Sequence, residues 1–116
     1  MNLSIESLSE MGAFTGAPVE KEITWKQGGK KLTATTYVRR LSYQSAMSEI
    51  EAHKNKSDLT ASRIAACICD DKGKQVFTPE DITGDADPER GPLDGNLVYA
   101  LLRVISEVND LGKPES

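Results

Sequence analysis

Few residues of this chain have the types and spacing that catalysis requires. A serine or cysteine nucleophile needs a nearby base, and the 116-residue sequence holds a single histidine, His53. Because His53 is followed by lysine at the polar end of a predicted helix, we interpret it as a solvated helix-end residue. An acid, a base, a nucleophile and an anion-binding site are not assembled from this set. The sequence therefore predicts that the protein is not an enzyme.

Metal and cofactor binding are not indicated either. Cys67 and Cys69 are the only cysteines, and no second pair supplies the other ligands of a zinc site. We expect both to be small buried hydrophobic side chains. The acidic loop over 85–91 begins like a calcium-binding loop, but Arg90 replaces its glycine and Asn96 its last glutamate. We expect no cofactor and no metal.

Composition excludes several classes of protein. A chain of 116 residues with 38% hydrophobic and 28% charged residues is typical of one globular domain. A formal net charge of -4 argues against binding nucleic acid through its phosphates. The sequence has no apolar run of membrane-spanning length, and its acidic start does not resemble a signal peptide. These properties predict a cytosolic protein without membrane or nucleic-acid partners.

The elements that must position any functional residue begin with a hairpin. Hydrophobic and β-branched residues alternate over 19–38, and Gly28 with Gly29 supplies a turn, so this range is predicted to be a β-hairpin. Residues 1–18 are predicted to form a strap or a short helix, because apolar residues recur there mostly every third position.

A helical part is predicted over 42–111. Its first helix spans about 43–54, with Tyr43, Ala46, Met47 and Ile50 on one face, and a second helix capped by Ser57 or Asp58 ends near Asp70. A short helix begins at Thr78 and Pro79 and ends at Gly84. The last helix carries a broad apolar stripe, which consists of Leu93, Leu97, Leu101, Val104, Ile105, Val108 and Leu111.

The predicted fold class is α+β. We expect a single domain over 1–116, with an N-terminal β-hairpin packed against three to four α-helices and mostly helical C-terminal two thirds. Residues 112–116 are predicted to be a flexible tail.

Basic residues are concentrated in the predicted hairpin, and acidic residues are concentrated toward the C-terminus. Residues 21–40 carry six bases and one acid, whereas residues 80–116 carry nine acids and three bases. The basic hairpin is interpreted either as an edge strand protected by lysines or as an electrostatic docking surface. The predicted partner-binding residues lie on the hairpin and on the terminal apolar stripe: Trp25, Lys30, Lys31, Arg39, Arg40, Leu97, Leu101 and Val108.

Three segments carry a resemblance to a known family. They are the hairpin together with residues 36–43, then residues 63–74, and then residues 76–82. In this order they resemble the tail assembly chaperones of long-tailed, lambda-like bacteriophages (siphoviruses). The similarity spans roughly 19–110 and includes a terminal helix over 97–109. Its motifs are packing and turn signatures, so no active site is transferred from the family.

The resemblance implies a helper protein in the host bacterial cytoplasm that is absent from the mature virion. Such a chaperone binds the tape measure protein and keeps it soluble while tail tube subunits polymerise around it. It also implies a homo-oligomer and a longer form, made by a ribosomal frameshift, that recruits the tail tube protein. The codons of Gly112 and Lys113 are a candidate slippage site. The alternative is a small structural virion protein, either a head–tail connector or a minor tail protein.

Overall fold

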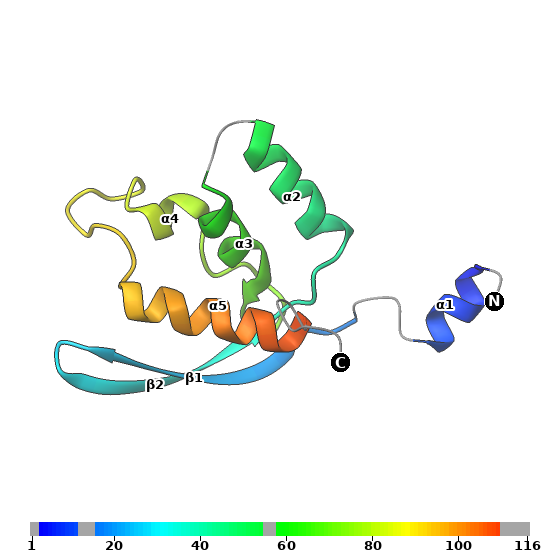
Figure 1. Cartoon of the computed structure of the whole chain (residues 1–116), viewed down its shortest axis with the longest axis horizontal. Helices are drawn as coiled ribbons and strands as arrows, with labels where there is room; N and C mark the ends of the chain where they lie inside the picture. Colours follow the sequence, from blue (N-terminus) through cyan, green and yellow to red (C-terminus); the bar gives the residue numbers. More distant parts are fainter. Residues whose placement is uncertain (1–2, 12–15, 55–57, 110–116) are drawn as a thin grey trace, which may run out of the picture.

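The computed structural model describes residues 3–11, 16–54 and 58–109 (Figure 1). Within helix α2 the side chains at 44, 45, 48, 49, 52 and 53 are not described. The described elements, in chain order, are α1 (Ile5–Glu10), β1 (Val19–Gln27), β2 (Lys30–Val38), α2 (Tyr43–Lys54), α3 (Leu59–Cys67), β3 (Ile68–Cys69), α4 (Pro79–Thr83) and α5 (Gly95–Asn109).

The hairpin is formed as the alternation predicts. β1 and β2 pair antiparallel from Val19 opposite Val38 to Gln27 opposite Lys30. Gly28 and Gly29 make the turn with φ of 59° and 79°, backbone angles that glycine adopts without a steric penalty. The apolar positions of both strands, Ile23, Trp25, Ala34 and Val38 among them, face one side of the sheet and contact the core.

A third strand corrects the predicted architecture. The helix expected to end near Asp70 ends at Cys67, because Ile68 and Cys69 leave it to pair with β2 opposite Val38 and Tyr37. The sheet therefore has three strands in the order β1-β2-β3. Sheet pairing overrides the local helical pattern here. A turn at Asp70 also ends the helical pattern, because the Asp70 carboxylate accepts hydrogen bonds from the backbone of Lys72 and Lys74.

The C-terminal two thirds of the chain are not mostly helical, so this part of the predicted fold is wrong. The helices are short, and between Cys69 and Gly95 the chain forms only the five-residue helix α4. The α+β class remains, but irregular segments replace much of the expected helix. Residues 112–116, predicted to be a flexible tail, lie outside the described residues.

The core lies between the sheet and two helices. α5 covers the face of β1, and α3 contacts β3, α4 and α5, while α2 packs on the outer side of α3 (Figure 1). α5 contributes Ala100, Leu101, Val104 and Ile105 to this core. The largest fully buried side chains are Ile64, Ile68, Leu101, Ile105, Val38, Cys67 and Cys69.

The end of α4 requires glycine for two reasons. Gly84 has φ of 95°, and a Cβ atom there would lie 2.7 Å from the backbone nitrogen of Pro92. We expect Gly84→Ala to lower the free energy of unfolding by more than about 2 kcal/mol, since left-handed strain alone costs about 1–2 kcal/mol. Urea unfolding measures this. Gly91→Ala is the matched control, because Gly91 has φ of 78° with no atom within 4 Å of its added Cβ. Equal losses in the two variants would contradict the clash.

Candidate partner-binding surfaces

An apolar groove runs beside the uncovered part of the sheet. α5 lies mainly over β1, and among the described helices none covers the remaining part of the apolar face of β2. The resulting hollow of about 530 Å³ is bounded by the hairpin, by α5 and by the segment that follows β3. We name it the apolar groove, and its apolar lining consists of Ile23, Trp25, Ala34, Ile68, Cys69, Val76, Phe77, Leu97 and Leu101.

The side chains at the mouth of the apolar groove are partly exposed. Trp25 and Phe77 are half-buried and pack against the core, whereas Val76 is 52% exposed. Asp70, Asp71 and Tyr37 supply polar groups at its edge. The carboxylate of Glu20, burial and the carboxylate of Asp71 together raise the pKa of Tyr37 above its ordinary value. A groove with this lining suits the apolar side chains of a partner segment.

A basic hollow adjoins the groove on the other side of Trp25. Lys26 and Lys31 from the hairpin and Arg103 from α5 line this hollow of about 480 Å³, together with Tyr99, which is 71% exposed. Asn96 ties the two elements together, since its side-chain amide donates to the carbonyl oxygen of Lys26 at 2.8 Å. Its described lining contains bases but no carboxylate. The hollow is therefore suited to acidic groups of a partner.

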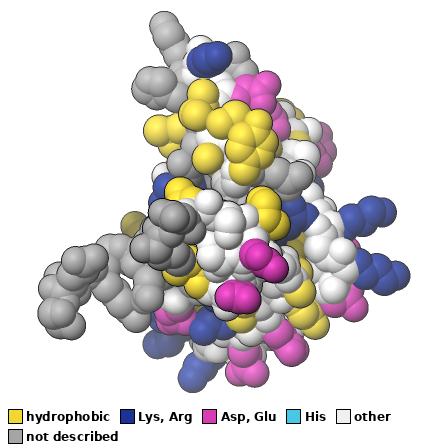
Figure 2. Space-filling view, turned by 90° about the vertical axis from the view of Figure 1, so that its right-hand side faces the viewer, with side chains coloured by type: hydrophobic (Ala, Val, Ile, Leu, Met, Phe, Trp, Pro, Cys, Tyr) yellow, Lys and Arg dark blue, Asp and Glu magenta, His cyan; other side chains and the backbone are white. Residues whose placement is uncertain are grey.

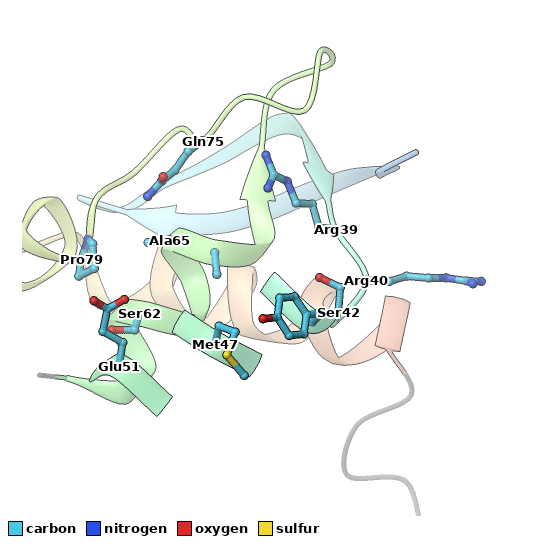
Figure 3. A pocket seen from close by; sticks show the side chains of 11 residues that line it. Arg39, Arg40, Ser42, Met47, Glu51, Ser62, Ala65, Gln75 and Pro79 are labelled. Carbon is cyan, nitrogen blue, oxygen red and sulfur yellow. The ribbon is translucent and has the colours of Figure 1, made fainter. Parts of the chain in front are cut away.

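A third hollow, of about 520 Å³, lies between α2, α3 and the segment leading to α4 (Figure 3). Arg39 lines it, and its guanidinium donates to the carbonyl oxygen of Gly73, which ties the turn after β3 to the end of β2. Arg40 also lines this hollow, but its side chain points away from it into solvent (Figure 3). Ser62 and Ala65 form part of the hollow on α3, while Met47 and Glu51 come from α2.

The structure distributes the predicted partner-binding residues over separate places. It brings Trp25 and Lys31 together at the basic hollow, with Lys30 exposed beside the hairpin turn. Leu97 and Leu101 meet Trp25 in the apolar groove, but Leu101 is only 2% exposed and belongs to the core. Arg39 and Arg40 lie at the hollow beside α2. Val108 is half-buried against the core near the end of α5.

Three surface features were not identified from the sequence. Phe77 and Tyr99 are not among the predicted partner-binding residues, although Tyr99 lies next to the apolar stripe of the last helix. The apolar side of α2 is also exposed, although its spacing is that of a helix face that packs: Tyr43, Met47 and Ile50 are 77%, 41% and 49% exposed. The sequence does carry a signal for the exposure of this side of α2. Residues 43–54 lack the broad apolar stripe that the terminal helix has.

The segment between Asp70 and Asp81 forms one wall of the apolar groove. The carboxylates of these two residues accept backbone hydrogen bonds that hold it in place. Hydrogen bonds from the backbone of Lys74 and Lys72 lower the pKa of Asp70. The backbone amide of Thr78 and the guanidinium of Arg90, at 2.9 Å, lower the pKa of Asp81. A lowered carboxyl pKa in the folded state stabilises the fold at pH values above the unfolded pKa of about 3.9. This stabilisation is lost as the pH falls through the lower folded value.

We therefore expect acid to weaken the fold through these two groups. The urea midpoint of the wild type should fall as the pH is lowered from about 5 to about 2.5. The double variant Asp70→Asn, Asp81→Asn should start lower and show a shallower dependence, because neither position titrates. Circular dichroism at a series of pH values measures both midpoints. If the urea midpoints of the two proteins fell in parallel with pH, Asp70 and Asp81 would not be the groups through which acid weakens the fold.

The described residues contain neither a membrane-spanning helix nor a metal-binding cluster. In residues 3–11, 16–54 and 58–109, no helix is long and apolar enough to cross a membrane. The same ranges contain no group of three or more histidine, cysteine, aspartate or glutamate residues placed to hold a metal ion. Cys67 and Cys69 are buried at 0% and 1% exposure, as predicted. The side chain of His53 lies outside the described part.

Comparison with known proteins assigns the chain to a family. No curated protein and no solved structure matches it. The model of the phage tail assembly chaperone family, TAC, matches residues 6–109. This confirms the resemblance, and the match begins before the hairpin, so it includes most of α1. A match over this range covers most of the chain, and the protein therefore belongs to the phage tail assembly chaperone family.

Proposed function

We propose that this protein binds the tape measure protein of its phage and keeps it soluble while tail tube subunits polymerise around it. Membership of the tail assembly chaperone family carries the proposal. The apolar groove supports it, because a chaperone for an apolar, helix-rich client needs an apolar surface that the client can cover.

The arrangement of the two hollows suggests how a client segment is held. Apolar side chains of a client helix enter the apolar groove between Trp25, Phe77 and Leu97. Acidic side chains on the same segment contact Lys26, Lys31 and Arg103 in the adjacent basic hollow. Trp25 lines both hollows, and we propose that one segment contacts both. Binding of this kind needs no catalytic residue, and we propose a non-catalytic role.

The proposed life cycle follows from the same role. The protein acts in the cytoplasm of the host bacterium, self-associates, and is left out of the mature virion. A frameshifted longer form carries an additional domain that recruits the tail tube protein to the bound tape measure protein. The basic hairpin then serves as an electrostatic docking surface and not only as an edge strand protected by lysines.

Co-expression tests the proposal directly. The tape measure protein is produced in bacteria alone, with the wild-type chain, or with a chain carrying Lys26→Glu, Lys31→Glu and Arg103→Glu. We expect soluble tape measure protein only with the wild type, and co-purification of the two proteins. Equal solubility in all three strains would overturn the proposal. Antibody detection of the chain in infected cells but not in purified particles would distinguish it from a structural virion protein.

A further inference from the structure

The basic hollow carries positive charge without a counter-charge among the residues that the structure describes. Lys26 and Lys31 stand directly opposite each other in the hairpin, and like charges at opposed positions destabilise a sheet. Arg103 adds a third cation to the hollow, and all three residues are exposed. The ion pairs formed by described residues involve none of the three. A partner that supplies carboxylates would relieve this repulsion.

The chain between α4 and α5 carries the opposite charge. Residues 85–89 contain three acids and no base, and we name them the acidic loop. Asp85, Asp87 and Glu89 are all exposed. The described hydrogen bonds of the two aspartate carboxylates go to Thr83 and to the backbone of the loop itself, not to a base. The acidic loop therefore presents three carboxylates to the surroundings.

The acidic loop and the basic hollow lie toward the same end of the molecule. Figure 1 shows the hairpin turn and the chain between α4 and α5 at the end opposite α1. That chain leads into α5 at Gly95, and the next residue, Asn96, donates to the carbonyl oxygen of Lys26 at 2.8 Å. Figure 2, which views the molecule from the other end, shows Lys and Arg side chains interspersed with Asp and Glu side chains. Bases and acids are thus separated, on the hairpin and on the loop, only toward the end that holds the hollow.

The acidic loop does not fill the hollow of its own chain. The described lining of the basic hollow contains no residue of the loop. The chain that follows the loop borders a different hollow, of about 560 Å³, which Leu93 and Leu97 line. Tyr99 and Arg103 of the basic hollow lie about 120° or more around α5 from Leu97. Within one chain, the loop and the basic hollow are therefore on different sides of α5.

We propose that the acidic loop of one copy docks in the basic hollow of a second copy, and that the contact is reciprocal. Because loop and hollow lie toward one end, a two-fold axis at that end places each loop at the other hollow and closes a dimer. Each contact pairs three carboxylates with three bases. The inference rests on the self-association proposed above and names the surfaces that produce it. A bound client uses the same bases in the proposed function, so the second copy and the client occupy the basic hollow in turn.

Charge reversal on each side of the contact tests the pairing. The loop variant carries Asp85→Lys, Asp87→Lys and Glu89→Lys, and the hollow variant carries Lys26→Glu, Lys31→Glu and Arg103→Glu. We expect light scattering coupled to size exclusion to find a dimer for the wild type and a monomer for either variant alone. An equimolar mixture of the two variants should dimerise again, because each loop then meets a hollow of opposite charge. A dimer in either variant alone, or no dimer in the mixture, would overturn the proposal.

A control variant has the same net charge as the loop variant. Glu6→Lys, Glu10→Lys and Glu20→Lys reverse three exposed acids that lie outside the acidic loop. This variant should dimerise like the wild type, and it should not restore a dimer to the hollow variant. The wild-type dimer itself should weaken by about tenfold or more between about 0.05 M and about 0.5 M salt, since salt screens exposed charge pairs. An affinity that is constant over this range would contradict the pairing without any substitution.

Solubility of the client separates this inference from the proposed function. The loop variant retains the apolar groove and the basic hollow, so it should keep the tape measure protein soluble although it is monomeric. A wild type that dimerises as described but leaves the tape measure protein insoluble would overturn the proposed function alone. A wild type that is monomeric at all concentrations would overturn this inference and leave the basic hollow to the client.

Discussion

Leu101→Ala is expected to lower the free energy of unfolding by about 2–5 kcal/mol, because a large core side chain is removed and leaves a cavity. Leu101 is 2% exposed and lies in the cluster that joins α5 to the sheet. Small domains have total stabilities of about 5–15 kcal/mol. The variant should therefore unfold at a markedly lower urea concentration, with an unchanged slope if unfolding remains two-state.

The same helix supplies the controls for this prediction. Tyr99→Ala removes a larger side chain that is 71% exposed, and should change stability by less than about 0.5 kcal/mol. Leu102→Ala, at a half-buried position, should give an intermediate loss. A loss below about 1 kcal/mol for Leu101→Ala would contradict its place in the core. Because Leu101 also lines the apolar groove, client binding is compared only where each variant remains folded.

Much of the local structure was predictable because it depends on neighbouring residues. Thr78 and Pro79 at the start of α4, Gly84 at its end, and Asp58, one of the two predicted caps of α3, all act within one helical turn. Each is visible in the sequence as a residue type at a fixed spacing. The hairpin register follows from alternation and from the Gly28–Gly29 turn in the same way.

The errors concern contacts between distant parts of the chain. Ile68 and Cys69 continue a helical pattern locally, and only their pairing with Val38 and Tyr37, about thirty residues earlier, makes them a strand. Periodicity also shows that Tyr43, Met47 and Ile50 share a face, but it does not show whether another element covers that face. In this structure none of the described elements buries it.

The candidate surfaces were predictable only in part for the same reason. Trp25 and Lys31 were named from charge and aromatic character on one hairpin, and the fold does place them at one hollow. Tyr99 and Arg103 join them only because α5 crosses β1. Leu101 belongs to the apolar stripe of the last helix and was predicted to contact a partner, but it is buried in the core. The spacing of a stripe does not show which of its residues are exposed and which are buried.

Val76→Glu should weaken binding of the tape measure protein by about 10- to 100-fold, which corresponds to about 1.4–2.8 kcal/mol. Val76 lies in the lining of the apolar groove at 52% exposure, so the charge is solvated in the free protein. A client segment seated in the groove would have to desolvate that carboxylate without supplying a partner, which costs at least this much. The loss should therefore appear in binding and not in stability.

Leu59→Glu provides the matched control for this change. Leu59 is 49% exposed at the first position of α3 and lies outside the lining of the hollows described above. A glutamate in the first turn of a helix is also compatible with the helix dipole. Titration of each purified variant with tape measure protein fragments, together with urea unfolding, measures both quantities. If the two variants bound equally well, the apolar groove would not be the surface that holds the client.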